Sequence, residues 1–158
     1  MMHSRTDREA GFTLLEMVCA LAIVGLLAAV LLPAIPRHTS RTRLEAYAIE
    51  AASLLKADRN AAIRQRLEVT TQVDAPKRSL RSGASRQAVQ VPDDVRFEAL
   101  LPRDCENRPV VASIIFFASG MSCGGVIVLT RLDAGYEIRV NWLTGRIEVV
   151  PGTGLANP

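Results

Sequence analysis

The chain contains only two histidines, and both lie outside the region that is predicted to fold as a domain. His3 is near the N-terminus and His38 follows a long apolar run, so no Ser/His/Asp set can be assembled from the residues downstream. Aromatic residues make up 4% of the chain and do not cluster, which argues against a stacking surface for nucleic acid. Cys105 and Cys123 have no histidine nearby and are too few for a structural zinc site. Catalysis, a cofactor and a bound metal are therefore not expected.

Charge is absent from Met17 to Pro36, although 22% of the whole chain is charged. A helix over these 20 residues would be about 30 Å long, which is the thickness of the hydrocarbon core of a membrane. A cleaved secretory signal would need a small-residue site after the run, and "LLPAIPRHTS" offers none. A lipoprotein signal at Cys19 is disfavoured by the large residues before it. The pattern therefore favours a retained single membrane span.

Glu16 lies at the N-terminal edge of this apolar run. One interpretation places the carboxylate at headgroup level, where it is simply hydrated. The other supplies a cation: cleavage between Gly11 and Phe12 would create an α-amino group four residues before Glu16. That amine carries charge near neutral pH and could pair with Glu16 of a neighbouring copy.

The segment "GFTLLEMVCALAIVGLLAAVLLPAI" resembles the N-terminus of type IV pilins and type II secretion pseudopilins. The resemblance rests on a glycine directly before Phe-Thr-Leu-Leu-Glu and an unbroken apolar helix. It implies that a prepilin peptidase cuts after Gly11 and N-methylates Phe12, and that Glu16 serves filament assembly. Pro33 falls where this family often carries a helix-kinking proline. The leader departs from the family because its side-chain charges sum to zero.

The stretch from Arg37 to Arg66 contains no glycine or proline and is rich in good helix formers. Its apolar residues recur at the helical period, so we expect a stripe that packs on a globular core. The residues of this stripe are Leu44, Ala48, Ala51, Leu55 and Ala62, flanked by Tyr47 and Leu54. The pattern predicts one long helix, with its first half in the membrane and its second half on the domain.

After Leu67 the apolar pattern changes to period two, which is typical of strands. Turn signals at Asp133–Gly135 and Asn141–Gly145 separate the last three runs, which predicts an antiparallel meander. The expected fold is α+β, a type IV pilin-like long helix packed on an antiparallel sheet domain. The expected strand runs are "EVTTQVD", "AVQV", "VRFEAL", "VVASIIFF", "GVIVLTR", "GYEIRV" and "GRIEVV".

The last quarter of the chain resembles a narrower family, the H-type minor pseudopilins and the related FimT-like minor pilins. These proteins end with an apolar strand, a glycine-rich loop, a "GG" strand start and then a strand with "TGR". The positions that match this loop motif are Phe116, Gly120, Gly124, Gly125, Gly145 and Arg146. Gly124 and Gly125 are expected to adopt conformations that other residues avoid, and they do not form a phosphate-binding loop.

Cys105 and Cys123 flank the expected strand Val110–Phe117. They form a disulfide if the domain lies in an oxidising compartment, and two free thiols are the alternative. Cys19 is interpreted as a small apolar residue of the span.

Residues 75–92 carry four cations, Lys77, Arg78, Arg81 and Arg86, and no acid. The stretch is polar and is interpreted as a mobile, solvated loop or a contact with a partner protein. Contact with DNA is the alternative, as in some FimT-like minor pilins. Those proteins tend to carry an arginine two positions after the "GR", where this chain has Glu148, so a nucleic-acid partner is not expected.

Together these patterns predict five segments: a leader over residues 1–11, a membrane helix over 12–36, its continuation over 37–66, a head over 67–150 and a tail over 151–158. The resemblance implies a structural subunit at or near the tip of the type II secretion pseudopilus. A FimT-like minor pilin that binds DNA or helps to start pilus assembly is the alternative. The implied partners are other pseudopilins, the prepilin peptidase and the inner-membrane assembly platform. The implied location is the inner membrane, with a cytoplasmic leader and a periplasmic head.

Overall fold

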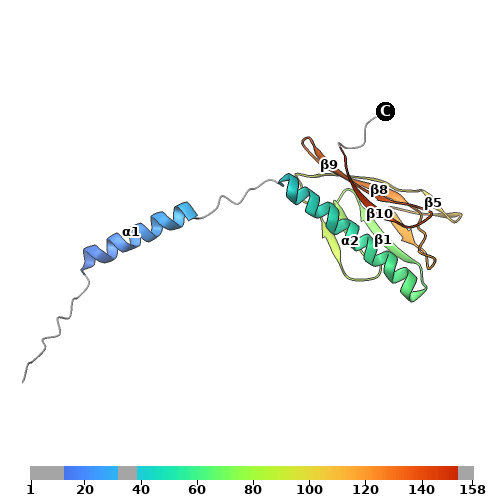
Figure 1. Ribbon diagram of the computed structural model, residues 1–158, viewed down its shortest axis with the longest axis horizontal. Coiled ribbons are helices and arrows are strands. Elements are labelled where there is room, and N and C mark those ends of the chain that lie inside the picture. The colour runs from blue at the N-terminus through green and yellow to red at the C-terminus, as the bar shows by residue number, and fades with distance from the viewer. Residues whose placement is uncertain (1–12, 32–38, 153–158) are drawn as a thin grey trace, which may run out of the picture. The chain divides into compact units, whose positions relative to one another are not determined.

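The computed structural model describes residues 13–31 and 39–152 of the chain. The chain divides into two compact units, residues 1–37 and residues 38–158, and each is described by itself. In the described part, the first unit contains helix α1 (Leu14–Leu31). The second unit contains helix α2 (Arg41–Gln65), drawn in cyan to green in Figure 1, and the strands. The strands are β1 (Val69–Asp74), β2 (Ser79–Arg81), β3 (Ala88–Gln90), β4 (Arg96–Leu100), β5 (Asp104–Cys105), β6 (Arg108–Pro109), β7 (Ser113–Phe116), β8 (Gly125–Arg131), β9 (Ala134–Val140) and β10 (Ile147–Pro151).

Helix α2 begins later than the pattern over 37–66 predicted. Ser40 has an extended backbone, with φ −74° and ψ 164°, and its hydroxyl accepts a hydrogen bond from the Arg43 N–H. Serine is a favoured N-cap because this bond satisfies a backbone donor that the first turn leaves unpaired. The expectation of an unbroken helix through this point is therefore wrong. Pro33, at the expected kink, lies outside the described residues.

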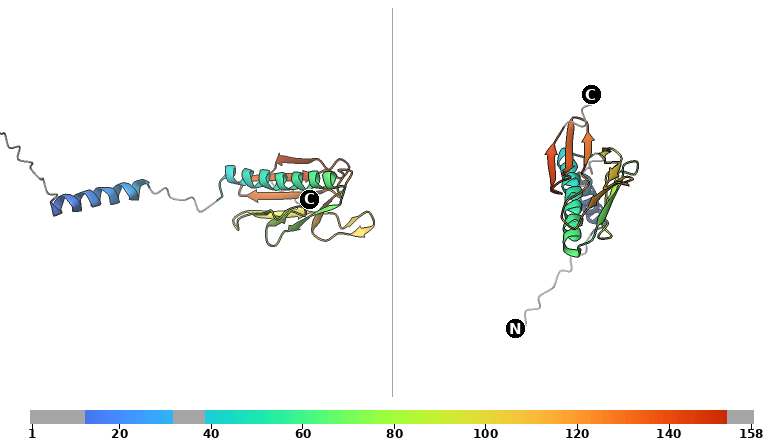
Figure 2. Two further views of the ribbon diagram at one scale, coloured as in Figure 1. Left: turned by 90° about the horizontal axis from the view of Figure 1, so that it is seen from below. Right: turned by 90° about the vertical axis from the view of Figure 1, so that its right-hand side faces the viewer.

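The expected apolar stripe of α2 is confirmed. Its stripe residues are 0–1% exposed, Leu54 is 4% exposed, and Tyr47 is partly buried against the same core. The stripe faces both sheets of the unit, because α2 contacts β1, β3 and β7 on one side and β8, β9 and β10 on the other. Figure 2 shows the helix running along the two sheets. Burial of this stripe removes its side chains from water and holds the two sheets around one core.

The sheets are antiparallel throughout. One has the order β3-β2-β1-β7, the second has the order β10-β9-β8-β4, and β5 and β6 form a separate small hairpin. The predicted meander of the last three strands is confirmed by the pairing of β8 with β9 and of β9 with β10. The turn between β8 and β9 consists of Leu132 and Asp133, since Arg131 pairs with Ala134. It lies one residue earlier than the predicted turn at Asp133–Gly135.

The basic stretch 75–92 contains an ordered hairpin, so its interpretation as a mobile loop is wrong. Strands β2 and β3 pair within it as a hairpin that extends the first sheet. Leu80, Val89 and Val91 in this stretch are 0–3% exposed. The four cations of the stretch outnumber these three apolar side chains. Burial of the three side chains nevertheless packs the hairpin against the core. Two of the cations are paired, because Lys77 contacts Asp74 and Arg78 contacts Asp93.

Asp58 anchors this hairpin to the helix. Its carboxylate is fully buried and accepts hydrogen bonds from the Thr71 hydroxyl at 2.6 Å, the Gly83 N–H at 3.0 Å and the Ala84 N–H at 3.3 Å. The Ser82 hydroxyl donates a further bond. A buried carboxylate is tolerated only when donors replace its water, and here strand β1 and the turn between β2 and β3 supply them.

Neither helix in the described part of the chain is long and apolar enough to cross a membrane. The predicted span over 12–36 includes residues 32–36, which the structure does not describe. It therefore stays a prediction.

Candidate functional site

The first described residues form a helix N-terminus around Glu16. Helix α1 begins at Leu14, and the Glu16 N–H donates to the Thr13 hydroxyl at 3.3 Å. Thr13 is thus the N-cap and Glu16 the third residue of the helix, which is the spacing of a capping box. A carboxylate there also faces the positive end of the helix dipole. Gly11 and Phe12, the predicted cleavage position, lie outside the described residues.

Helix α1 has apolar side chains on every side. Leu14, Leu15, Leu21, Val24 and Leu26 are each between 61% and 83% exposed within the chain. A helix that is apolar all round is normally covered by protein or by lipid, because so much apolar area is costly in water. Glu16 is the acidic residue of its first turn.

The two predicted glycine loops meet at one side chain, Arg59 of α2. Its Nε donates to the Gly120 carbonyl at 3.0 Å, and an Nη donates to the Thr144 carbonyl at 3.0 Å. The guanidinium therefore ties the loop between β7 and β8 to the loop between β9 and β10. Its planar fork suits this bridge, because two donors are held in fixed directions.

Gly145 is required by the close approach of these loops. Its φ is +62°, and a Cβ built there would lie 2.0 Å from the Gly120 carbonyl oxygen. Gly120 has φ +84° and faces Arg59 and Ile63 of α2. Glycine is the residue that reaches such conformations without steric cost.

The "GG" pair begins β8 beside the β9–β10 loop. Gly124 has φ +79°, and a Cβ on it would lie 3.1 Å from the Cβ of Trp142. The Ser122 N–H donates to the Trp142 carbonyl at 3.0 Å. Gly125 has φ +149°, so both glycines adopt the conformations that the sequence predicted for them.

The structure joins Cys105 and Cys123 in a disulfide, with their Cα atoms 5.7 Å apart. The bond ties the β5–β6 hairpin to the loop that precedes β8. Of the two alternatives that the sequence left open, the structure has the bonded one. Cys19 is a free thiol on α1.

Arg146, the last residue of the loop motif, pairs with Glu148 at 2.7 Å between Nε and Oε1. Both residues line a groove of about 650 Å³ between α2 and the β9–β10 loop. The groove also contains Lys56, Arg59 and Asn60, so its cations outnumber its single acid.

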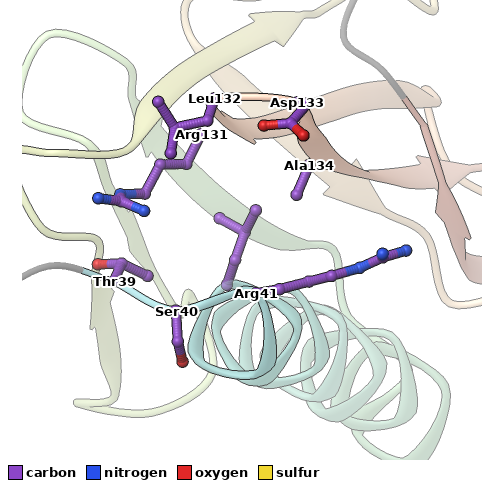
Figure 3. Close-up of a pocket in the computed structure, with 8 residues that line it drawn as sticks. Thr39, Ser40, Arg41, Arg131, Leu132, Asp133 and Ala134 are labelled. Atoms are coloured by element: carbon purple, nitrogen blue, oxygen red, sulfur yellow. The ribbon is translucent and has the colours of Figure 1, made fainter.

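At the other end of α2, Asp94 connects the start of the helix to the β8–β9 turn. Its two oxygens accept from the Thr39 N–H at 2.7 Å and the Thr39 hydroxyl at 2.8 Å, and Arg131 Nε donates at 2.9 Å. These bonds, those of Thr39 first, lower the pKa of Asp94 to about 2. Thr39, Arg131, Leu132 and their neighbours line a hollow of about 200 Å³, in which Arg131 reaches toward Thr39 (Figure 3).

The sequence missed Arg59, Asp58 and Asp94 as organising residues. The partners of Asp58 are 13 to 26 positions away, those of Asp94 include Thr39 at 55 positions, and Arg59 reaches Thr144 across 85. The single usable signal was Asp58 itself, an acid on the stripe side of a helix between Leu55 and Ala62. Such a residue needs buried donors, which implies a tethered segment.

Three comparisons with known proteins bear on this arrangement. Residues 6–32 match the prokaryotic N-terminal methylation motif. The chain is 29% identical over 142 residues to the type II secretion system protein H of Xanthomonas campestris pv. campestris, which covers 89% of this chain and 83% of that protein.

The fold is that of solved pilin-like proteins. The minor pseudopilin EpsH from the type 2 secretion system of Vibrio cholerae has a TM-score of 0.54 at 10% identity, over 68% of this chain and 95% of that chain. The type IV minor pilin FimU of Pseudomonas aeruginosa has a TM-score of 0.54 at 19% identity, over 72% and 92%. The predicted α+β pilin-like fold is confirmed. The chain is thus similar to a type II secretion system protein H in sequence, and to a minor pseudopilin and a type IV minor pilin in fold.

Proposed function

We propose that this chain is a structural subunit at or near the tip of the type II secretion pseudopilus, where it helps to drive protein export across the outer membrane. The observation that carries the proposal is the combination of an N-terminal methylation motif with similarity to a secretion protein H along 89% of the chain. The relatives are structural subunits, and the role proposed here is mechanical rather than enzymatic.

Maturation is the first step of this role. A prepilin peptidase cuts between Gly11 and Phe12 and methylates the new amine of Phe12. The methylation motif at residues 6–32 spans this boundary and supports the proposal. Glu16 then pairs with such an amine as the subunit enters the filament.

The proposed placement is the inner membrane, crossed once, with the leader 1–11 in the cytoplasm and the head in the periplasm. The apolar surface of α1 supports an anchor in lipid. The Cys105–Cys123 disulfide supports an oxidising compartment for the head. The segments 12–36, 67–150 and 151–158 are the proposed anchor, head and tail, and the segment 37–66 contains helix α2, which begins at Arg41.

The proposed partners follow from this placement. They are the prepilin peptidase, the other minor and major pseudopilins, and the inner-membrane assembly platform. The methylation motif supports the first of these, and the fold shared with a minor pseudopilin supports the second.

A FimT-like minor pilin of a type IV pilus is the second candidate, and the likeness to FimU is the observation that favours it. Two contacts weigh against DNA binding. Arg146 is paired with Glu148 in the loop motif, and Arg78 is paired with Asp93 in the basic hairpin. Paired cations contribute less to phosphate binding, because a carboxylate already neutralises them.

The proposal is tested by complementation of a strain that lacks the gene. The full chain should restore export of a type II substrate, and the membrane-extracted protein should start at a methylated Phe12 by mass analysis. Gly11→Ala should be cut, whereas Gly11→Trp should stay uncut and fail to restore export, because a bulky residue obstructs the cleavage site. If the deletion strain still exports the substrate but loses pilus function, the secretion proposal is wrong and the pilus alternative holds.

A further inference from the structure

The β7–β8 loop and the β9–β10 loop lie at the C-terminal end of α2 (Figure 1). Large apolar residues of these loops and of this helix end are exposed. The group, here called the Trp142 surface, consists of Ile63, Met121, Trp142 and Leu143. Trp142 is the one tryptophan of the chain and is 63% exposed, and Leu143 is 55% exposed. Ile63 and Met121 are 39% and 38% exposed.

The loop that carries Trp142 is held in shape by several hydrogen bonds. The Asn141 side-chain oxygen accepts from the Leu143 N–H at 3.0 Å, the Thr144 N–H at 2.9 Å and the Thr144 hydroxyl at 3.1 Å. Arg59 holds the Thr144 carbonyl, and Ser122 holds the Trp142 carbonyl. A loop fixed in this way loses little conformational freedom on binding, so its exposed side chains can contribute fully to affinity.

The charge around this surface is mainly positive. Lys56 and Arg59 line the adjoining groove, in which Arg146 is paired with Glu148. Arg64 and Arg66 stand at the end of the same helix. A partner with carboxylates around its contact area would be steered to this end and oriented there.

We propose that the Trp142 surface docks onto the head of another pilin-like subunit, into an apolar hollow edged by carboxylates. Exposed tryptophan in a rigid setting with arginine beside it is the usual composition of an interface hot spot. This inference rests on the proposed function, because it takes the partner to be a fellow filament subunit.

Protein is favoured over nucleic acid as the partner. Three of the four side chains are aliphatic or thioether groups, which offer no flat face for a base, and Arg146 is already paired with Glu148. An apolar cluster with one aromatic anchor fits a protein hollow better than it fits a sequence of stacked bases.

The test places a photo-crosslinking amino acid at Leu143 in the full chain, in cells that contain the complete secretion system. The matched control is the same amino acid at Leu132, which is 85% exposed on the β8–β9 turn at the other end of α2. Position 143 should give an adduct with a protein that itself carries an N-terminal methylation motif. Position 132 should not give that adduct.

Affinity for the subunit identified in this way is then measured with both full chains in detergent. Trp142→Ala should weaken binding at least about tenfold. Lys56→Glu should also weaken binding and flatten its dependence on salt, whereas Leu132→Ala should leave it unchanged. The emission of Trp142 should shift to the blue when the partner is added, since the indole leaves water. Equal unfolding midpoints for the variants exclude a folding defect.

Three results would overturn the inference: adducts at position 143 only with lipid or non-pilin proteins, unchanged affinity of Trp142→Ala, or an emission change with oligothymidylate and not with the subunit. The export assay keeps the two proposals separate. If full export persists with Trp142→Ala, the docking surface is wrong and the pseudopilin function stands. If the wild-type chain fails to restore export, the function itself is wrong.

Discussion

At the scale of single residues, Arg59 and Gly145 form one unit. Gly145 brings its loop so close to the Gly120 carbonyl that no side chain fits, and Arg59 then binds the carbonyls of both loops. The exposed Trp142 depends on this arrangement for its position. The positive φ and the missing side chain of Gly145 thus let its loop lie where Arg59 of α2 can bind it.

Arg59→Met should lower the free energy of unfolding by about 2–3 kcal/mol, because two carbonyls lose charged donors while the aliphatic bulk is kept. Arg59→Lys should recover only part of the loss, since one ammonium cannot reproduce the fork. Arg64→Met, five residues further along α2, is the matched control and should change little. Urea unfolding of the three variants measures this. Equal losses for Arg59→Met and Arg64→Met would contradict the anchoring role.

Asp94 gives a prediction on pH. Its pKa is lowered to about 2 by Thr39 and Arg131, against 3.8 for a free aspartate. The folded state therefore prefers the ionised form, so this contribution to stability is complete above about pH 4 and is lost as the pH falls toward 2. The stability difference between wild type and Asp94→Asn, from urea unfolding, should be constant above pH 4 and shrink below it. Asp133→Asn, on the same hollow, serves as the control, and a difference that grows at low pH would refute the assignment.

At the scale of elements, the small hairpin β5–β6 is the part with least support from the sheets. It pairs through only two residues on each strand, and the disulfide from Cys105 ties it to the loop before β8. Arg108 adds an ion pair with Glu68 at 2.8 Å. Covalent and ionic links here take the place of the burial that holds β2–β3 to the core.

Cys105→Ser with Cys123→Ser should lower the free energy of unfolding by about 3 kcal/mol, because the bond closes a loop of about 18 residues in the unfolded chain. The wild-type protein should show the same loss in reductant, and the double variant should be insensitive to reductant. Alkylation before and after reduction, followed by mass analysis, checks the bond directly. Labelling of both thiols without reduction would contradict it.

At the scale of the whole molecule, Glu16 combines a place in the first turn of α1 with a proposed role in assembly, and the substitution Glu16→Gln separates the two. Glu16 is the third residue of α1, and its N–H donates to the Thr13 hydroxyl at the spacing of a capping box. The role proposed for its carboxylate is to pair with the amine of another subunit. Glutamine suits a capping box as well as glutamate does, but it carries no charge.

Glu16→Gln should therefore keep processing and insertion intact yet reduce crosslinking to neighbouring subunits nearly as much as Glu16→Ala does. Loss of one partner of a poorly hydrated ion pair leaves the other charge unpaired, which is the costly case. Thr13→Val removes the cap and keeps the charge, so it should crosslink normally. The measurement is the crosslinking yield per processed chain in membranes. Normal yield with Glu16→Gln would assign Glu16 to the cap alone.

The sequence by itself determined the features that depend on local repetition: the N-terminal motif, the apolar stripe of α2, the antiparallel meander and the glycines with positive φ. Periodicity and glycine placement report such features because each is decided within a few residues. The tertiary structure alone decided the ordered pairing of strands within residues 75–92 and the roles of Asp58, Arg59 and Asp94. Each of these depends on a side chain that contacts a segment far along the chain. The partner of such a side chain is defined only in the packed structure, because a polar group from which water is excluded must form hydrogen bonds with the groups that lie beside it.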